Sequence, residues 1–505
     1  MKRGGKERAK YGDFQTPAWF AHKVCAFLSS GGVAPKSILE PTCGVGNFLL
    51  AALEVFTTAD AALGVDINQA YVAQLREQVD AYADGKSVDV MQADFFQMDW
   101  SSVLRTLPDP VLVVGNPPWV TNADATLLDS GNLPPKRNIG NHAGIEAITG
   151  ASNFDISEWM LLRMIAWIAD KQGVVAVLCK TSVARRVLRQ VWQEASASGS
   201  AQIHLFNAQE VFNVAVDACL FIYDTTDPLA SQTCQIYEAL STDSLAATIG
   251  YRDKQLVADV NRYERWKHLQ RAAKSVYRWR SGIKHDCAGV MELRRVHGTF
   301  VNLLGETVTL EDTYVYPLLK SSDIATARQV ASRWMVVPQR AVGENTQVIQ
   351  RTAPLTWAYL SDHAEMLDGR RSVIYRHQPR FSVFGVGPYA FARWKVGISG
   401  LYKQLEFVVV GPQENRPTVL DDTCYFLACD SEGEAVLLAD LLRSRPAREF
   451  YASFIFWDAK RPITARILNK LDLFTLAEVM GRRAELEEFV GARERMPAQQ
   501  LRLFD

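Results

Sequence analysis

Ser37-Ile-Leu-Glu-Pro-Thr-Cys-Gly-Val-Gly-Asn-Phe48 joins a short apolar strand to a helix through a turn that contains two glycines. Glycines in such a turn let the main chain approach a ligand at the carboxyl edge of a parallel sheet. The spacing differs from G-x-G-x-x-G and from G-x-x-x-x-G-K-S/T, and no lysine follows to hold a phosphate. The stretch therefore predicts an α/β fold with a small-molecule site at a sheet edge, and it disfavours nucleotide phosphates.

Strands and helices alternate on both sides of this turn. Thr16 is the expected N-cap of a first helix whose first turn holds Pro17. Further helices are expected at 48–55 and 68–83. The expected strands are 37–40, 61–66, 88–93, 111–115, 173–179, 201–206 and 216–224. This alternation predicts a mainly parallel sheet that is covered by helices on both faces.

Polar groups follow the second and third of these strands as well as the first. Asp66 ends the second strand, where its carboxylate is suited to accept hydrogen bonds from ribose hydroxyls. Asp94-Phe-Phe96 follows the third strand and is suited to bond an adenine amino group and to flank its ring. A strand-end Asp is also a common cap. The carboxyl ends of parallel strands share one edge, so these groups are expected to meet.

The fourth strand, Val111-Leu-Val-Val-Gly115, runs into Asn116-Pro-Pro-Trp119. The Asn116 side-chain oxygen and the Pro117 carbonyl are acceptors for the two N–H bonds of a planar amino group, and Trp119 offers a ring for stacking. Proline has no N–H and stiffens the turn, so its carbonyls point outward. The tetrapeptide alone is equally consistent with an ordinary turn. Together with the upstream strand ends it favours methylation of an exocyclic nitrogen.

Residues 120–153 interrupt the alternation. The stretch is rich in Asn, Gly, Asp and Pro and begins directly behind the Asn-Pro-Pro-Trp turn. A segment of this length without periodicity predicts a functional lid or binding loop. A disordered insertion is the alternative interpretation.

Composition bounds the class of protein. The 505 residues are 48% hydrophobic and 22% charged, which indicates a globular protein of two or three domains. No signal peptide and no run of about 18 apolar residues is found, so a cytoplasmic location is expected. The eight cysteines form no C-x-x-C pair, which argues against zinc and against a disulfide framework.

Charge is unevenly distributed along the chain. The net charge is −8 over residues 1–250, +10 over 251–400 and −3 over the remainder. A basic segment behind an acidic half is typical of a polyanion-binding module fused to a catalytic domain, although a solvated face gives the same pattern. Aromatic residues interleave these charges, as they also do along an amphipathic helix. They are Tyr263, Trp266, Tyr277 and Trp279.

Taken in this order, the motifs resemble those of the gamma-class adenine-N6 DNA methyltransferases, class I S-adenosylmethionine-dependent enzymes that accompany restriction systems. Gly12-Asp-Phe-Gln-Thr-Pro17 resembles their N-terminal cofactor motif, and Glu40 to Phe48 resembles their glycine motif. Asp66 and Asp94 resemble the next two acidic positions, and Asn116 to Trp119 the catalytic motif. Trp119 departs from the Tyr that many relatives carry.

The resemblance implies two sets of site residues and no metal. Phe212, ahead of the strand 216–224, resembles a second aromatic that packs against the target base. The implied catalytic residues are Asn116, Pro117, Pro118, Trp119 and Phe212. The implied S-adenosylmethionine-binding residues are Thr16, Pro17, Glu40, Pro41, Thr42, Cys43, Gly44, Gly46, Phe48, Asp66, Ile67, Asp94, Phe95 and Asn116.

The family's mechanism implies base flipping. An adenine would leave the duplex, lie between Trp119 and Phe212, and receive the methyl group on N6, giving S-adenosylhomocysteine as product. Double-stranded DNA is the implied partner, and a separately encoded restriction endonuclease is allowed. The resemblance also implies a Rossmann-like methyltransferase domain at 1–245 and a mixed α+β DNA target-recognition domain at 246–505. Residues 314–320, 394–400 and 456–462 resemble segments of the family's target-recognition region.

Several alternatives stay open at this point. Methylation of protein glutamine, of RNA bases or of cytosine N4 uses similar chemistry, and a non-catalytic DNA specificity subunit retains a similar scaffold. Cytosine-C5 methylation is disfavoured because the chain has no Pro-Cys dipeptide. A fused nuclease is disfavoured because no carboxylate and lysine set is found; Asp286 with Glu292 is followed by Leu-Arg.

Overall fold

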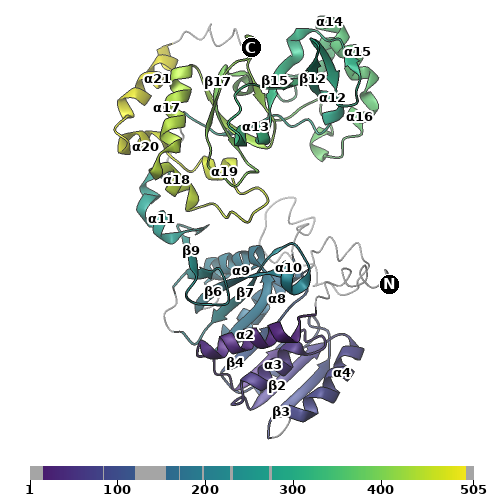
Figure 1. The fold of residues 1–505 in the computed structure, drawn as a ribbon, viewed down its shortest axis with the longest axis vertical. Coiled ribbons are helices and arrows are strands. Elements are labelled where there is room, and N and C mark those ends of the chain that lie inside the picture. The colour runs from purple at the N-terminus through teal and green to yellow at the C-terminus, as the bar shows by residue number, and fades with distance from the viewer. Residues whose placement is uncertain are drawn as a thin grey trace. The chain divides into compact units, whose positions relative to one another are not determined.

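The computed structural model describes residues 15–82, 85–119, 155–169, 171–195, 198–227, 231–271 and 276–495. The chain divides into two compact units, residues 1–260 and 261–505 (Figure 1). Residues 246–260, which the sequence placed in the second domain, extend the sheet of the first unit because β9 and β10 pair there. No helix within the described ranges has the length and apolar character needed to span a bilayer.

The first unit is built on one ten-stranded sheet with the order β10-β9-β8-β6-β7-β5-β4-β1-β2-β3. Strands β3, β2, β1, β4 and β5 are parallel, and β7 runs antiparallel to β5 and β6. This confirms the predicted mainly parallel α/β fold. The strands are β1 (Ser37–Glu40), β2 (Ala61–Asp66), β3 (Ser87–Gln92), β4 (Val111–Gly115), β5 (Gly173–Lys180), β6 (Ser200–Asn207), β7 (Asp217–Asp224), β8 (Thr233–Tyr237), β9 (Leu245–Arg252) and β10 (Gln255–Val257).

Helices cover this sheet, and α2 and α3 lie together on one face (Figure 1). Leu112 and Val114 of β4 join their hydrophobic core, and all five residues of β4 are buried because the opposite face is covered too. Thr16 is not the N-cap of α2; Pro17 occupies that position and no side chain caps the helix. The helices are α2 (Ala18–Ser30), α3 (Asn47–Val55), α4 (Gln69–Val79), α5 (Trp100–Thr106), α8 (Ile156–Ala169), α9 (Thr181–Glu194) and α10 (Ala208–Phe212), with the 3-10 helix η1 (Asp80–Tyr82).

The second unit is mixed α+β, as predicted, with a four-stranded sheet (β11-β20-β17-β18) and a six-stranded sheet (β14-β13-β12-β16-β15-β19). Its strands are β11 (Arg280–Ser281), β12 (Glu292–Val296), β13 (Thr299–Asn302), β14 (Thr307–Val308), β15 (Val315–Leu319), β16 (Arg333–Val336), β17 (Trp394–Ser399), β18 (Val408–Val410), β19 (Val419–Leu420) and β20 (Cys424–Cys429). Its helices are α11 (Val260–Trp266), α12 (Ala288–Met291), α13 (Ser321–Ala325), α14 (Ile349–Thr352), α15 (Pro354–Asp362), α16 (Ala364–Asp368), α17 (Glu432–Arg443), α18 (Arg445–Ala452), α19 (Ala465–Leu468), α20 (Leu473–Val479) and α21 (Arg483–Arg495). Its 3-10 helices are η2 (Lys267–Leu269), η3 (Asp312–Tyr314), η4 (Thr346–Val348), η5 (Val373–Tyr375) and η6 (Pro388–Phe391).

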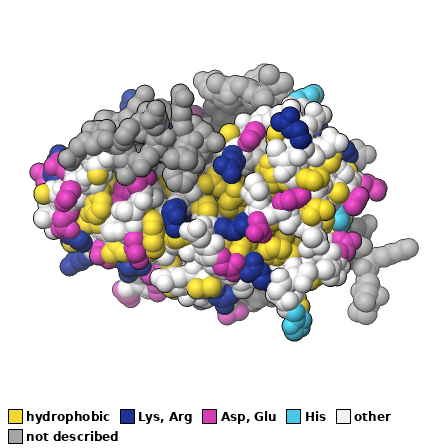
Figure 2. All heavy atoms as spheres, turned by 90° about the horizontal axis from the view of Figure 1, so that it is seen from above, with side chains coloured by type: hydrophobic (Ala, Val, Ile, Leu, Met, Phe, Trp, Pro, Cys, Tyr) yellow, Lys and Arg dark blue, Asp and Glu magenta, His cyan; other side chains and the backbone are white. Residues whose placement is uncertain are grey.

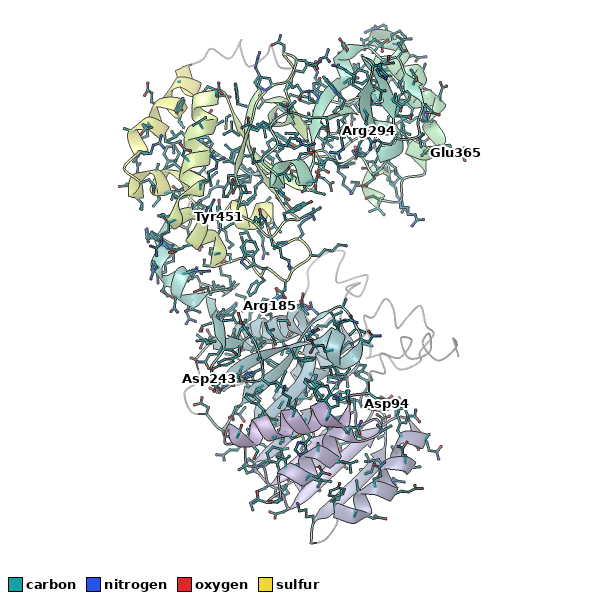
Figure 3. All side chains as sticks on the ribbon, viewed as in Figure 1. Asp94, Arg185, Asp243, Arg294, Glu365 and Tyr451 are labelled. Atoms are coloured by element: carbon teal, nitrogen blue, oxygen red, sulfur yellow. The ribbon has the colours of Figure 1, made fainter. Side chains whose placement is uncertain are left out.

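Large side chains fill the interior of the second unit. Tyr451 of α18 is fully buried, and its hydroxyl donates to the Leu468 carbonyl over 3.1 Å (Figure 3). Lys395 of β17 is also fully buried, and its ammonium group donates to the carbonyls of Ala392 and Thr418. Burial lowers the pKa of Lys395 to about 7. A neutral amine has two N–H bonds, so it can make one hydrogen bond to each of these two carbonyls.

The aromatic residues of the basic segment are structural. Tyr263, Tyr277 and Trp279 are buried, and the half-buried Trp266 donates its indole N–H to Glu449. These rings are therefore not an exposed stacking surface. Tyr263 and Trp266 lie on α11, whereas Tyr277 and Trp279 lie in non-helical chain, so one amphipathic helix does not account for all four rings. On the face shown in Figure 2, Lys and Arg side chains are dispersed among apolar and acidic ones and do not form one patch.

Candidate active site

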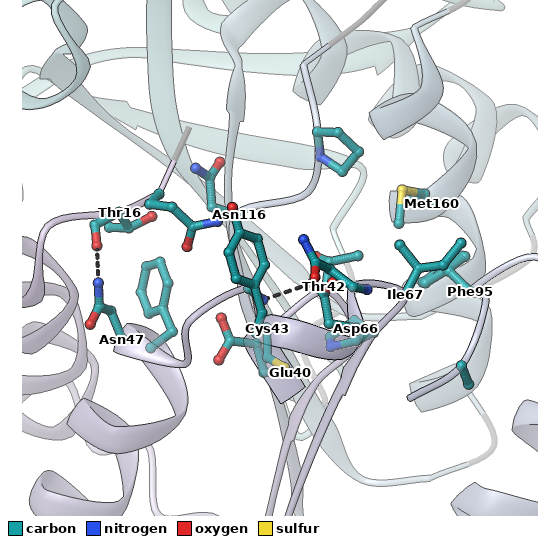
Figure 4. Close-up of a pocket in the computed structure, with 18 of the residues that line it drawn as sticks. Thr16, Glu40, Thr42, Cys43, Asn47, Asp66, Ile67, Phe95, Asn116 and Met160 are labelled. Carbon is teal, nitrogen blue, oxygen red and sulfur yellow. Dashed lines mark hydrogen bonds between the residues drawn. The ribbon is translucent and has the colours of Figure 1, made fainter. Parts of the chain in front are cut away.

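A cavity of about 440 Å³ opens at the carboxyl ends of β1, β2 and β4 (Figure 4). Its volume is in the range of small-molecule sites. The expected cofactor residues that line it are Thr16, Glu40, Pro41, Thr42, Cys43, Gly44, Phe48, Asp66, Ile67, Phe95 and Asn116. The sequence motifs that follow separate strands therefore meet at one site.

Three expected cofactor residues do not line the cavity: Pro17, Gly46 and Asp94. The Asp94 carboxylate (Figure 3) accepts hydrogen bonds from the Phe96 N–H and the Gln97 side chain, each over 2.8 Å, and so caps its own turn. Gly46 acts through packing instead. Its φ is +86°, and a Cβ there would lie 2.1 Å from Leu75 Cδ1 of α4.

Asp66 ties the glycine turn to the end of β2. One carboxylate oxygen accepts the Gly44 N–H and the other accepts the Asn68 N–H, each over 2.8 Å (Figure 4). A carboxylate oxygen has two lone-pair directions, so a carboxylate at this position is chemically suited to accept from ligand hydroxyls as well as from main-chain N–H groups. Ile67, the next residue, leaves half of its side chain exposed and also lines the cavity.

Glu40 lies at the base of the cavity and is buried. Burial raises the pKa of Glu40 well above its ordinary value; the Leu49 N–H, which donates to its Oε2 over 2.8 Å, acts in the opposite direction, and the Asp66 charge adds to the rise. Gly115, the last residue of β4, lies directly beside it: φ is +151°, and a Cβ there would be 3.3 Å from Glu40 Cγ. A bound cationic group would favour the ionised form of Glu40.

Two threonine residues that line the cavity have buried hydroxyl groups without a hydrogen-bond partner among the described residues. Within the described ranges, Thr16 Oγ1 and Thr42 Oγ1 are buried and have no hydrogen-bond partner. Asn47 donates to the Thr16 carbonyl over 2.7 Å and so holds that segment at the cavity (Figure 4). Since an unsatisfied buried polar group costs about 1–3 kcal/mol, these hydroxyls fit a ligand with polar atoms.

Asn116 and Pro118 line the cavity, whereas Pro117 and Trp119 do not. Trp119 is 6% exposed, and its indole N–H donates to the Leu178 carbonyl of β5 over 3.3 Å. Phe212 meets its ring edge to face, with 5.4 Å between centroids and 73° between planes. The structure thus brings the two expected aromatics together, but a base stacked between parallel rings needs about 7 Å, so the expected sandwich requires these rings to separate.

Some lining residues were not among the predicted ones. Tyr71 lies on α4, four residues after Ile67, and Asn47 is the first residue of α3, directly after Gly46. Their positions next to predicted residues offered a signal for both. Met160 comes from α8, and no sequence motif marks it. The lining residues outside the implied cofactor and catalytic sets are Gln15, Asn47, Asn68, Tyr71, Ala93, Phe96 and Met160. The expected loop at 120–153 and Gly12 to Phe14 lie outside the described residues.

Comparisons with known proteins identify the chain's relatives. It is 44% identical over 476 residues to the type II methyltransferase M.NspV of Nostoc sp. (strain ATCC 29411 / PCC 7524), covering 94% of this chain and 98% of that one. It is 29% identical over 134 residues to the type II methyltransferase M.CvrRI of Paramecium bursaria Chlorella virus XZ-6E, covering 26% of this chain and 31% of that one. No family model matches.

Among solved structures, the type IIL restriction-modification enzyme MmeI in complex with DNA is similar over 89% of this chain, with a TM-score of 0.52. The chain spans 63% of the length of that protein. At 14% sequence identity this likeness shows a shared fold.

Proposed function

The chain belongs to the type II methyltransferases, and we propose that it transfers a methyl group from S-adenosylmethionine to N6 of adenine at specific sites in double-stranded DNA. The observation that carries the proposal is the shared cavity of Asp66, Glu40 and Asn116. In this cavity Asp66 and Glu40, which suit an adenosine and an amino acid, lie with the Asn116 amide, which suits a planar amino group.

The residues of the cavity fit S-adenosylmethionine, which when bound supplies a methyl carbon activated by a sulfonium. The Asp66 oxygens would accept from the ribose hydroxyls, and Ile67 and Phe95 would flank the adenine ring. The buried hydroxyls of Thr16 and Thr42 would donate to the carboxylate of the methionine part. Glu40 would pair with its ammonium group.

Asn116 and Pro117 would prepare the acceptor. The lone pair of an exocyclic amino nitrogen is delocalised into the ring, so the nitrogen is a poor nucleophile. Hydrogen bonds from its two N–H groups to the Asn116 side-chain oxygen and the Pro117 carbonyl oppose that delocalisation. Stabilising and positioning the reacting nitrogen in this way lowers the barrier without a protein nucleophile.

The acceptor base would leave the duplex, because N6 of a paired adenine is not accessible to a site at a sheet edge. Trp119 and Phe212 would receive it after their edge-to-face contact opens. The second unit would read the target sequence. Its role as a target-recognition domain is supported by the fold likeness to MmeI, which extends over most of the chain.

The test is product analysis. Purified protein is incubated with S-adenosylmethionine and amplified, unmodified bacterial DNA, and the digested nucleosides are identified by mass spectrometry. N6-methyladenine is the expected product. N4-methylcytosine, or methylation of RNA with none of DNA, would replace the proposal with the corresponding alternative, and no transfer to any nucleic acid would end it.

A further inference from the structure

A lysine at the end of β5 contacts the Asn-Pro-Pro-Trp segment. Lys180 Nζ donates to the main-chain carbonyl of Trp119 over 3.1 Å and to Asp155 Oδ2 over 2.8 Å. The Lys180 side chain is 25% exposed and that of Asp155 is 4% exposed. A buried carboxylate thus fixes the lysine that binds this carbonyl.

The topology explains why β5 reaches Trp119. Strands β4 and β5 are parallel neighbours, with Gly115 opposite Val177, so both end at the same edge of the sheet. β5 holds Trp119 twice, because Leu178 accepts the indole N–H and Lys180 binds the carbonyl. The ring and the main chain of this one residue are therefore both attached to a neighbouring strand.

Asp155 is itself held in place. Its Oδ1 accepts the Ser157 hydroxyl over 2.6 Å and the Ser157 N–H over 3.2 Å, at the start of α8. Its other oxygen is left to bind Lys180. The carboxylate also balances the lysine charge, which matters because positive charge develops on the amino nitrogen of the acceptor during methyl transfer.

We propose that Lys180 and Asp155 are positioning residues for methyl transfer. By fixing the Trp119 carbonyl, they set the path of the main chain through Pro117 and Pro118 and thereby the direction of the acceptor oxygens. The proposal rests on the proposed function. Neither residue touches the cofactor cavity, so their loss affects the rate of transfer and not the binding of the cofactor.

The chain contains a matched control at the other end of the same strand. Lys171, just before β5, donates to the Leu107 carbonyl and to Asp109 Oδ1, each over 2.7 Å, and its side chain is 18% exposed. It makes the same pair of contacts, one carbonyl and one aspartate, but at the amino edge of the sheet. Lys171→Met therefore shows how much activity is lost through destabilisation alone when such a lysine is removed far from the Asn-Pro-Pro-Trp segment.

The experiment compares single-turnover rates of methyl transfer to amplified DNA, with enzyme in excess over DNA. Lys180→Met is expected to lower the rate about 10- to 100-fold, the size of effect that follows a small misplacement of catalytic groups. Lys171→Met is expected to keep the wild-type rate. The dissociation constant of S-adenosylhomocysteine, measured by calorimetry, is expected to stay within twofold in both variants.

Two further variants guard against misfolding. Lys180→Met leaves the buried Asp155 without its cation, so the neutral pair Lys180→Met/Asp155→Asn is made in parallel and is expected to show the same loss of rate. Lys180→Arg retains the charge and the donors and is expected to recover part of the rate. A wild-type rate in the neutral pair, or an equal loss in Lys171→Met, overturns the proposal.

The proposed function has its own separate failure. If the wild-type protein transfers no methyl group to DNA, the proposed function falls and the positioning role falls with it. If the wild-type protein is active and the Lys180 variants match its rate, only the positioning role is lost.

Discussion

Asp66→Asn is expected to weaken binding of S-adenosylhomocysteine about 10- to 100-fold. In the structure the two carboxylate oxygens accept one main-chain N–H each, from Gly44 and Asn68. An amide has only one oxygen, so its NH₂ group must face one of these two donors. The substitution keeps the size and shape of the side chain but removes one hydrogen bond to a charged group.

The magnitude follows from that single loss. A hydrogen bond to a charged group contributes about 1.5–3 kcal/mol, and about 1.4 kcal/mol corresponds to a tenfold change in affinity. The glycine turn of the free variant relaxes away from the arrangement that the ligand requires, so the loss is expected to appear in the dissociation constant. Isothermal titration calorimetry with S-adenosylhomocysteine measures it without involving the acceptor.

Asp60→Asn is the matched control. Asp60 immediately precedes β2, the same strand that Asp66 ends, and its side chain is 64% exposed in an ion pair with Lys36 of 3.4 Å. Such an exposed pair contributes little, so the control is expected to bind as the wild type does. If Asp66→Asn binds within twofold of the wild type, the assignment of Asp66 to the cofactor site is refuted.

Three further predictions concern the acceptor, the fold and the buried lysine. Asn116→Ala is expected to lower methyl transfer about 10²–10³-fold, as removal of one hydrogen-bonding group at a reacting centre does; a tritiated-methyl assay checks this, and retained activity contradicts the assignment. Gly46→Ala is expected to lower the free energy of unfolding by about 2–5 kcal/mol, from a left-handed backbone and the overlap with Leu75. Gly32→Ala is the control, because φ is +90° there and no described atom lies within 4 Å of an added Cβ. It should lose only the free energy that comes from the left-handed backbone, and an equal loss of unfolding free energy in both variants, measured in urea, would contradict the prediction. Burial lowers the pKa of Lys395 to about 7, so between about pH 7 and 10.4 the unfolded chain binds one proton more than the folded chain. The free energy of unfolding therefore rises with pH across that range. Lys395→Met should reduce this rise, and an unchanged slope of unfolding free energy against pH would contradict the prediction.

The glycine turn and the strand ends were predictable because their signals are local. An apolar run that stops at a glycine or an Asn-Pro turn marks the end of a strand, and parallel strands then bring those ends to one edge. Asp66 and Asn116 were placed at the cavity on this reasoning. Met160 could not be predicted in this way, because its place at the cavity depends on how α8 packs against the sheet and no sequence motif marks it.

The hydrogen bonds of Asp94 could not be predicted from its position alone. A strand-end aspartate suits both a ligand contact and a turn cap, and the structure shows that its carboxylate accepts from the Phe96 N–H and the Gln97 side chain. The contact of Lys180 with Trp119 was equally hidden, because 61 residues separate them in sequence and a lysine at a strand end looks like any other. The predicted boundary at residue 245 falls 15 residues before the division between the two compact units, because β9 and β10 add to an existing sheet without any break in composition.

Gly115 has a consequence for how such proteins diversify. It is the single residue between the last buried valine of β4 and Asn116. A Cβ there would lie 3.3 Å from Glu40 Cγ, and β4 is paired on both sides. An insertion or a larger residue at this junction would shift the Asn116 amide relative to the rest of the cavity that it lines. We therefore expect changes of target sequence to lie in residues remote from this edge.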